Sequence, residues 1–299
     1  MPYLKHIALA GAGNLGSFIL DELVTFGNFA QVTVLTRPSS DKTFPAGVNV
    51  KAVDYADQVQ LEQALEGVDA VVSVLTAFDS QNNLVHAAKA AGVKLFVPSE
   101  FGNPTLGLTT SDHPALYGKV ETHALLRSVQ LPSLLVFTGP FLDQMIGPVI
   151  GLDFAALSAS IVGTGATPIS FTARADIGRF LAHHLGSLSA SALPQPGELA
   201  VLPIEGDRAS LLDVVAAWER HHPGKKVSVS HVPLPEADAA AANVQGDFFT
   251  SLVMYLRAAW ERGATVDQGK GRDAIARWDG WAPLTVEEHF RAAAAAAEQ

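Results

Sequence analysis

Three glycines near the N-terminus have the spacing of a phosphate-binding turn. A short apolar run directly precedes the motif Gly11-Ala-Gly13-Asn14-Leu15-Gly16, and helical spacing follows it. The first glycine of such a motif permits a tight turn, the second lets the backbone approach a pyrophosphate, and the third allows close packing of helix on strand. The N-terminus of the helix then offers N–H groups and partial positive charge to phosphates. This context predicts dinucleotide binding, and a purely structural turn is the alternative.

The residues after the predicted second strand distinguish NADP from NAD. An NAD site usually carries Asp or Glu about 20 residues past the glycines, at the end of the second strand. Here that strand runs into Thr36-Arg37-Pro-Ser39-Ser, and the first acid is Asp41. A guanidinium at position 37 can clamp a 2′-phosphate, Ser39 can donate a hydrogen bond, and Lys42 adds positive charge. The sequence therefore predicts NADP(H), and a solvated Arg37 without a ligand is the alternative.

An alternation of apolar runs and helical segments predicts the scaffold that would position these residues. The apolar runs are 6–10, 32–36, 48–53, 69–76, 93–97 and 134–138. The segments with helical spacing between them are 14–26, 58–66, 80–91 and 117–130. Nearly continuous apolar runs are typical of strands buried on both faces. The pattern predicts an α/β fold with a doubly wound parallel sheet.

Beyond residue 140 the alternation becomes less regular. Helical spacing occurs at 175–187, 209–221, 246–262 and 285–297, and strand-like runs occur at 168–172, 199–203 and 226–231. This pattern predicts a smaller mixed α/β region. We expect an NADP-binding domain at 1–150 and a smaller substrate-binding region at 151–299. The boundary is nominal, because chains of this kind can return to the first domain.

Composition narrows the classes of partner and location. The 299 residues are 48% hydrophobic and carry a formal net charge of −10, which disfavours disorder and direct binding of nucleic acid or an anionic membrane. There is no cysteine, no His-Glu-x-x-His pattern and no apolar window of the ~20 residues that a membrane span needs. The N-terminus has no signal pattern. We expect a cytoplasmic protein without a metal, and the oligomeric state stays open.

Several longer motifs resemble one known family. They are Leu61…Ala64-Leu65-Glu-Gly67-Val-Asp69-Ala-Val-Val-Ser73, the stretch Ala87–Gly102 that ends in Pro98-Ser99-Glu100-Phe101-Gly102, and Ala175-Asp176-Ile177-Gly178. Together with the glycine motif and Arg37, they are similar to the NmrA-like and isoflavone-reductase-like group of atypical short-chain dehydrogenases, over roughly residues 5–290. The resemblance implies a Rossmann-type domain with a smaller C-terminal substrate region. It also implies NADPH-dependent reduction of small aromatic, conjugated or quinone-like molecules, although other family members are NADP(H)-sensing regulators without turnover.

The resemblance also implies roles for individual residues. Lys119 matches the active-site lysine of the family. The residues implied to contact the cofactor, besides the glycine motif and the cations, are Thr76, Ala77, Gln81, Pro98, Ser99, Lys119, Gly139, Pro140 and Phe141. Two positions depart from the family pattern: Gly139 replaces a frequent Asn, and Gly13-Asn14 replaces a frequent Thr-Gly. The first departure removes a polar contact with the cofactor.

Lys119 is the candidate for proton transfer. Common short-chain dehydrogenases carry Tyr-x-x-x-Lys, but position 115 is Ala, and Tyr117 does not share a helical face with Lys119. A lysine beside a nicotinamide in a closed pocket can give or take a proton on a phenol or carbonyl oxygen. The alternative is that Lys119 only bonds ribose hydroxyls or lies in solvent.

Neighbouring residues would form the substrate pocket. His123 lies four residues after Lys119 on the same face and could position substrate, with an exposed or capped histidine as the alternative. Phe101 and Met145 would contribute to an apolar wall that suits an aromatic substrate, unless they belong to the core. The loop 102–114 is long enough for a mobile lid, although disorder is an equal alternative. The sequence thus predicts an NADPH-dependent reductase, or else a cofactor-sensing regulator.

Overall fold

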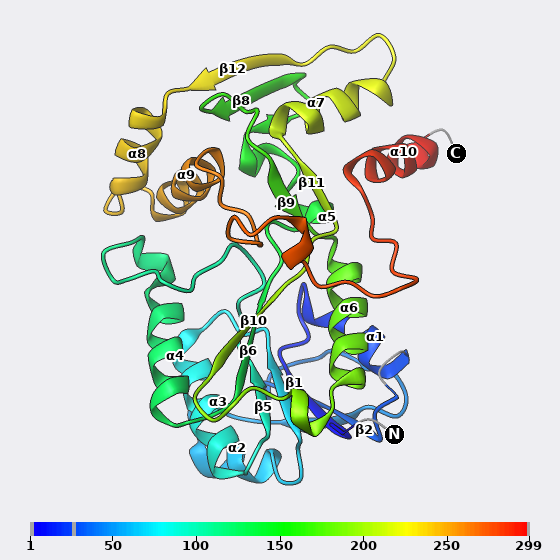
Figure 1. Ribbon diagram of the computed structural model, residues 1–299, viewed down its shortest axis with the longest axis vertical. Coiled ribbons are helices and arrows are strands. Elements are labelled where there is room, and N and C mark those ends of the chain that lie inside the picture. The colour runs from blue at the N-terminus through cyan, green and yellow to red at the C-terminus, as the bar shows by residue number, and fades with distance from the viewer. Residues whose placement is uncertain (1–2, 26–27, 298–299) are drawn as a thin grey trace. The chain divides into compact units, whose positions relative to one another are not determined.

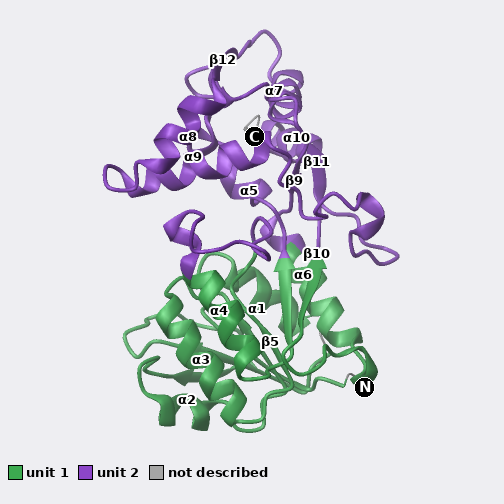
Figure 2. Ribbon diagram, turned by 60° about the vertical axis from the view of Figure 1, so that its left-hand side comes forward, with its two compact units in different colours: residues 1–101, 118–136, 177–202 green, residues 102–117, 137–176, 203–299 purple. Residues whose placement is uncertain are grey.

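The chain forms two compact units. The computed structural model describes residues 3–25 and 28–297, so residue 26, the last of the predicted helix 14–26, lies outside it. Unit 1 comprises residues 1–101, 118–136 and 177–202, and unit 2 comprises 102–117, 137–176 and 203–299 (Figure 2). Each unit is assembled from three segments, so no single cut separates them. The division into an NADP-binding domain at 1–150 and a substrate-binding region at 151–299 stays a prediction.

A central sheet organises unit 1. Within the described residues it has seven strands in the order β10-β6-β5-β4-β1-β2-β3 (Figure 1). Their bounds are β1 His6–Ala10, β2 Gln31–Thr36, β3 Asn49–Ala52, β4 Ala70–Ser73, β5 Leu95–Val97, β6 Ser133–Phe137 and β10 Leu199–Pro203. Strand β1 pairs in parallel with β2 on one side and β4 on the other. The pairs β2–β3, β4–β5 and β5–β6 are also parallel.

This strand order confirms the predicted Rossmann-type doubly wound sheet. The chain proceeds from β1 outward to β3 and then returns to place β4 on the other side of β1. The order therefore reverses between β1 and β4. In open α/β sheets, ligands bind outside the carboxyl ends of the strands at such a reversal. The predicted glycine turn follows β1 directly, so it lies at this edge of the sheet.

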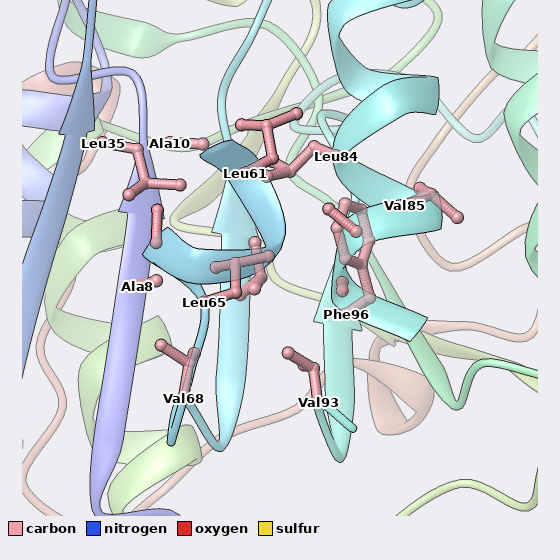
Figure 3. Packing of buried hydrophobic residues seen from close by; sticks show 14 of the residues in the cluster. Ala8, Ala10, Leu35, Leu61, Leu65, Val68, Leu84, Val85, Val93 and Phe96 are labelled. Carbon is pink, nitrogen blue, oxygen red and sulfur yellow. The ribbon is translucent and has the colours of Figure 1, made fainter. Parts of the chain in front are cut away.

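Helices cover both faces of the sheet in unit 1. They are α1 Gly16–Thr25, α2 Gln58–Ala64, α3 Phe78–Ala90, α4 Tyr117–Ser128 and α6 Arg174–Ser187. Side chains from α2, α3 and α4 share one buried cluster with Ala8, Leu35 and Phe96 of the strands (Figure 3). Figure 1 shows α1 and α6 on the opposite side of the sheet. Each large apolar side chain fully buried in this way contributes about 1.5–3 kcal/mol.

A glycine allows the two helices on the second face to approach closely. A Cβ on Gly178 of α6 would lie 2.5 Å from the backbone oxygen of Phe18 in α1. Real Cβ atoms do not come this near to a carbonyl oxygen, so any larger residue would push the helices apart. The glycine of the Ala175-Asp176-Ile177-Gly178 motif therefore has a packing role.

Unit 2 is a mixed α/β assembly of about the same size as unit 1, not a smaller one. Its strands are β7 Leu152–Asp153, β8 Ser158–Val162, β9 Ile169–Phe171, β11 Asp207–Ala209 and β12 Ser228–Val232, and its helices are α5 Leu142–Met145, α7 Leu211–Arg220, α8 Leu234–Ala242, α9 Phe248–Glu261 and α10 Val286–Ala297. The sheet β12-β8-β7 and the antiparallel pair β9–β11 share this unit. Phe154 stacks on Trp218 with ring centroids 4.9 Å apart, and Phe290 meets Phe154 edge-on. These rings belong to the core of the unit.

Five of these elements of unit 2 were not predicted from the sequence: β7, β8, β11, α5 and α8. Strand β8 reads Ser-Ala-Ser-Ile-Val, which lacks a strong apolar run, and α8 reads Leu-Pro-Glu-Ala-Asp-Ala-Ala-Ala-Ala. Strand β8 is held in parallel pairing with β12, about 70 residues later in the chain. Among the described helices, none is long and apolar enough to cross a membrane.

Candidate cofactor-binding and catalytic site

The glycine motif forms the turn between β1 and α1. Gly11 has a φ of +92°, a left-handed conformation that favours glycine, and its N–H donates to the Leu35 oxygen at 3.3 Å. A Cβ on Gly16 would lie 2.0 Å from the Gly11 oxygen, so the helix packs against the turn itself. A Cβ on Gly13 would have no heavy atom within 4 Å. The turn is thus closed at Gly16 and open at Gly13, as a backbone cradle for a phosphate requires.

The two residues between these glycines differ in exposure. The side chain of Leu15 is 7% exposed and belongs to the core, whereas Asn14 is exposed. Leu15 can therefore offer a ligand only its backbone. Helix α1 begins at Gly16, and the positive end of its dipole favours an anion there.

Positive charge accompanies this turn. Lys42 donates from Nζ to the backbone oxygen of Ala12 at 2.7 Å, so its ammonium lies directly beside the glycine motif. Arg37 and Ser39 are exposed just beyond β2, and a turn closes there through the Ser40 N–H and the Arg37 oxygen at 3.0 Å. In the described part of the chain, no carboxylate lies within ion-pair distance of Arg37. Two cations with little local compensation suit a dianionic phosphate.

A buried tyrosine supports the strand that carries Arg37. The Tyr55 hydroxyl donates to the Leu35 oxygen at 3.1 Å. Burial raises the pKa of Tyr55, while the positive charge of Arg37 acts in the opposite direction. The hydroxyl therefore stays protonated and fixes the end of β2, from which Arg37 extends.

The segment after β4 contains residues with different exposure. Thr76 and Ala77 are exposed beyond the end of β4, whereas Gln81 on α3 is only 1% exposed. The Gln81 Oε1 accepts a hydrogen bond from the Ser99 N–H at 2.8 Å, and its Nε2 donates to Thr122 Oγ1 at 3.3 Å. The expected contact of Gln81 with a cofactor stays a prediction. Gln81 holds the backbone of Ser99, next to the buried Pro98.

Lys119 lies against the turn that follows β5. Its Nζ donates to the backbone oxygen of Glu100 at 2.7 Å and lies 3.3 Å from Glu100 Oε2. The lysine side chain is 16% exposed and that of Glu100 only 1%. His123 Nε2 lies 2.8 Å from Glu100 Oε1, and its side chain is 5% exposed. The three side chains form one cluster, in which a buried carboxylate joins a lysine and a histidine.

Two of these positions refine the sequence analysis. Of the alternative of an exposed or capped His123, only the exposed form is wrong, because the ring is buried and bonded to Glu100. Glu100 was not identified as a site residue from the sequence, although it lies inside the Pro98–Gly102 motif. The signal was a charged residue three positions after a buried strand and directly before Phe101, since a carboxylate is rarely buried unless it is paired. Phe101, the next residue, is buried with a φ of +28°.

The segment Gly139–Phe141 belongs to unit 2. Gly139 has a φ of +65°, and a Cβ there would lie 2.1 Å from the Ser170 oxygen. Glycine at this position, where relatives often carry Asn, is thus required by the approach of β9. Phe141, which follows Pro140, pairs with Thr172 and is the N-cap of α5, and Met145 packs against the core cluster of the unit. Both side chains are partly buried.

The loop expected to be a lid or disordered is fastened within unit 2. Trp260 Nε1 donates to Asn103 at 3.0 Å, and the Tyr255 hydroxyl donates to Asp112 at 3.3 Å. His113 Nε2 lies 2.8 Å from the Ser251 hydroxyl, and burial lowers the pKa of His113. These contacts tie residues 102–114 to α9. Within the described residues, 3–25 and 28–297, no group of three His, Asp or Glu side chains could hold a metal ion.

The sheet order and the glycine turn at its reversal define a Rossmann-type α/β protein. The chain belongs to the NmrA-like family, whose sequence profile it matches over residues 5–290. This match confirms the resemblance drawn from the motifs.

Known relatives cover most of the chain. It is 33% identical to the oxidoreductase aprR of Aspergillus flavus over 80% of both chains. It is 28% identical to quinone oxidoreductase 2 of Escherichia coli over 79% of this chain and 80% of the relative. Among solved structures, AtPrR2 with NADP+ and (+)pinoresinol superposes with a TM-score of 0.79 at 17% identity, covering 98% of this chain and 99% of that one. This last likeness confirms the fold.

Proposed function

We propose that the protein is an NADPH-dependent oxidoreductase that reduces a small aromatic, conjugated or quinone-like molecule. The observation that carries the proposal is a lysine of low exposure held by Glu100, in the same unit as an open glycine turn flanked by two cations. Similarity to oxidoreductases supports the reaction class, and similarity to a quinone oxidoreductase and to a reductase in complex with pinoresinol supports the substrate class.

The residues of unit 1 fit a dinucleotide phosphate. The backbone at Gly11, Gly13, Asn14, Leu15 and Gly16 would hold the pyrophosphate, because a Cβ at Gly13 would occupy otherwise open space. Arg37, Ser39 and Lys42 would hold the 2′-phosphate that distinguishes NADPH from NADH. Thr76, Ala77, Pro98 and Ser99 would border the nicotinamide half, with Gln81 fixing Ser99. Cofactor contacts of Gly139, Pro140 and Phe141, which belong to unit 2, stay a prediction of the sequence.

Lys119 would handle the proton of the reaction. Bound NADPH supplies a hydride for an electrophilic carbon of the substrate. The Lys119 ammonium has three N–H groups, one of which donates to the Glu100 oxygen. Another N–H would donate to the phenol, carbonyl or quinone oxygen on which negative charge develops, and Lys119 would transfer its proton there. Phe101 would border the substrate, its apolar side chain excluding water from the proton transfer. His123, bonded to Glu100, would act through that carboxylate and not on the substrate itself. A substrate contact of Met145, which belongs to unit 2, stays a prediction of the sequence.

The test is NADPH oxidation against a panel of quinones and conjugated aromatic molecules, with NADPH affinity measured separately. We expect turnover with at least one class, and a fall in kcat of roughly 10²–10⁴-fold for Lys119→Ala. Lys89→Ala is the matched control, because Lys89 lies at the far end of α3 and donates only to the Gln130 oxygen. Tight NADPH binding without turnover on any compound would favour a cofactor-sensing regulator. A Lys119→Ala variant with unchanged kcat would remove the proposed proton role.

A further inference from the structure

Glu100 and His123 form a buried pair, and Glu100 also contacts Lys119. We propose that His123 and Glu100 are the positioning residues of the active-site lysine, with His123 fixing the Glu100 carboxylate and Glu100 fixing the ammonium. This inference rests on the proposed function, because it assigns the device that holds Lys119 in place during proton transfer. Both residues act through Lys119 and are therefore positioning residues.

The hydrogen bonds show which of the three side chains donates to which. An ionised carboxylate only accepts hydrogen bonds, so the 2.8 Å contact requires that His123 carries a proton on Nε2 and donates it to Glu100 Oε1. The other oxygen, Oε2, faces Lys119 Nζ at 3.3 Å. One carboxylate therefore bridges the two side chains, and its rotation about the last side-chain bond is limited from the histidine side.

The Glu100 carboxylate is buried and therefore depends on its two partners. The side chain of Glu100 is 1% exposed, and a carboxylate in such surroundings is stable only when charged or donating groups surround it. Lys119 is held at two points by the same residue, the backbone oxygen at 2.7 Å and the carboxylate. Its long, flexible stem would otherwise leave the ammonium free to take several positions.

The backbone of α4 is held by a separate set of contacts. A Cβ on Gly118 would lie 2.1 Å from the Phe78 ring, so the first turn of α4 packs directly on α3. Thr122, fully buried, lies within hydrogen-bond distance of Asn82 Oδ1 and Gln81 Nε2. Lys119 and His123 are four residues apart, so both face Glu100 from one side of this helix. A change at His123 should thus loosen the carboxylate while α4 stays in place.

The experiment compares His123→Leu, which removes the donor, with His123→Gln, whose side-chain amide can restore an N–H near the position of Nε2. His86→Leu is the matched control, an exposed histidine on α3 in the same unit. One measurement is kcat, KM and the NADPH dissociation constant of each variant. The other is the rate at which an acylating reagent labels Lys119 in the protein without NADPH or substrate, read by peptide mass spectrometry.

We expect His123→Leu to lower kcat by roughly tenfold to a hundredfold, the scale of a small misplacement of a reacting group, with KM and NADPH affinity little changed. Labelling of Lys119 should become faster in His123→Leu, while His123→Gln should restore both values toward those of the wild type. A His123→Leu variant with wild-type kcat and wild-type labelling would overturn the proposal. So would a fall in kcat that His123→Gln does not reverse at all.

The experiment distinguishes a misfolded variant, a failure of the positioning role and a failure of the proposed function. If His123→Leu is unfolded by circular dichroism, Glu100→Gln replaces it, because this variant keeps the shape of the side chain and removes its charge. Unchanged labelling of Lys119 in a folded Glu100→Gln protein would refute the positioning role. If the wild type binds NADPH but turns over no compound of the panel, the proposed function fails, and the labelling rates alone decide the positioning proposal.

Discussion

Alanine substitutions at Gly13 and Gly16 should separate binding of the cofactor from stability of the fold. Both glycines belong to the same turn, yet their surroundings are opposite. A Cβ at position 16 would lie 2.0 Å from the Gly11 oxygen and 3.0 Å from a Val74 methyl group, whereas one at position 13 would meet nothing within 4 Å. The same substitution to alanine therefore disturbs the packing of the protein at Gly16 and fills the space for a ligand at Gly13.

The expected magnitudes follow from these distances. A carbon and an oxygen in contact need more than 3 Å, so Gly16→Ala must displace α1 from the turn by about 1 Å, and overpacking of this kind costs roughly 1–3 kcal/mol. Gly13 has no steric conflict and no positive φ, so Gly13→Ala should be neutral or stabilise by about 0.4–1 kcal/mol. It should weaken NADPH by the loss of one or more hydrogen bonds to a charged phosphate, each worth about 1.5–3 kcal/mol, or roughly tenfold to 150-fold.

The assay pairs urea unfolding with titration calorimetry of NADPH. Gly16→Ala should lose both stability and affinity, whereas Gly13→Ala should lose affinity alone. NADPH binding by Gly13→Ala at wild-type strength would refute the assignment of the turn to the pyrophosphate. A Gly16→Ala protein as stable as the wild type would show that α1 tolerates the displacement and would refute the packing argument.

Three further outcomes test other parts of the structure. Arg37→Ala should weaken NADPH roughly tenfold to a hundredfold and NADH little, since one charged hydrogen-bond partner of the 2′-phosphate is lost; equal losses in calorimetry would refute the assignment of Arg37. Gly178→Val should lower the free energy of unfolding by at least about 1–3 kcal/mol in urea, because its Cβ would meet the Phe18 oxygen at 2.5 Å, and wild-type stability would contradict the close approach of α1 and α6. Hydrogen bonds from the Ser210 side chain and backbone lower the pKa of Asp213, so its contribution is complete above the ordinary Asp value near 3.8 and is lost as pH falls through the lower folded value. Asp213→Asn should therefore cost about 0.3–1.5 kcal/mol at neutral pH, and a cost that persists unchanged at pH ~2 would refute the capping-box assignment.

Local sequence signals predicted most of the scaffold of unit 1. The apolar runs at 6–10 and 134–138 correspond to β1 and β6 within one residue at each end. Such strands lie between two layers of helices, so nearly every side chain is apolar and the run is visible without any knowledge of its neighbours. In unit 2, β8 was missed because three of its five residues are Ser or Ala, and its pairing with β12 decides its conformation.

Some residues of the candidate site could be identified from the sequence, and others could not. The glycine motif and Arg37 could be identified from the sequence because each acts through its own backbone or charge at a fixed point of a strand–turn–helix unit. Glu100 and His123 could not be assigned to one cluster, because they lie 23 residues apart and meet only when α4 packs beside the end of β5. The sequence also could not show why position 139 is a glycine, because the Ser170 oxygen that leaves no room for a Cβ comes from a residue 31 positions later in the chain.

The sequence by itself determined the succession of strands and helices in unit 1, the glycine turn and the charge beside it, because these depend on periodicity and residue type over short stretches. Only the tertiary structure decided which distant residues share a buried environment. It placed Gln81 where its side chain supports the backbone of Ser99, and it joined Lys119 to a buried carboxylate and a histidine. The reason is physical: burial and long-range contact set the neighbours of a charged group, and no local pattern encodes them.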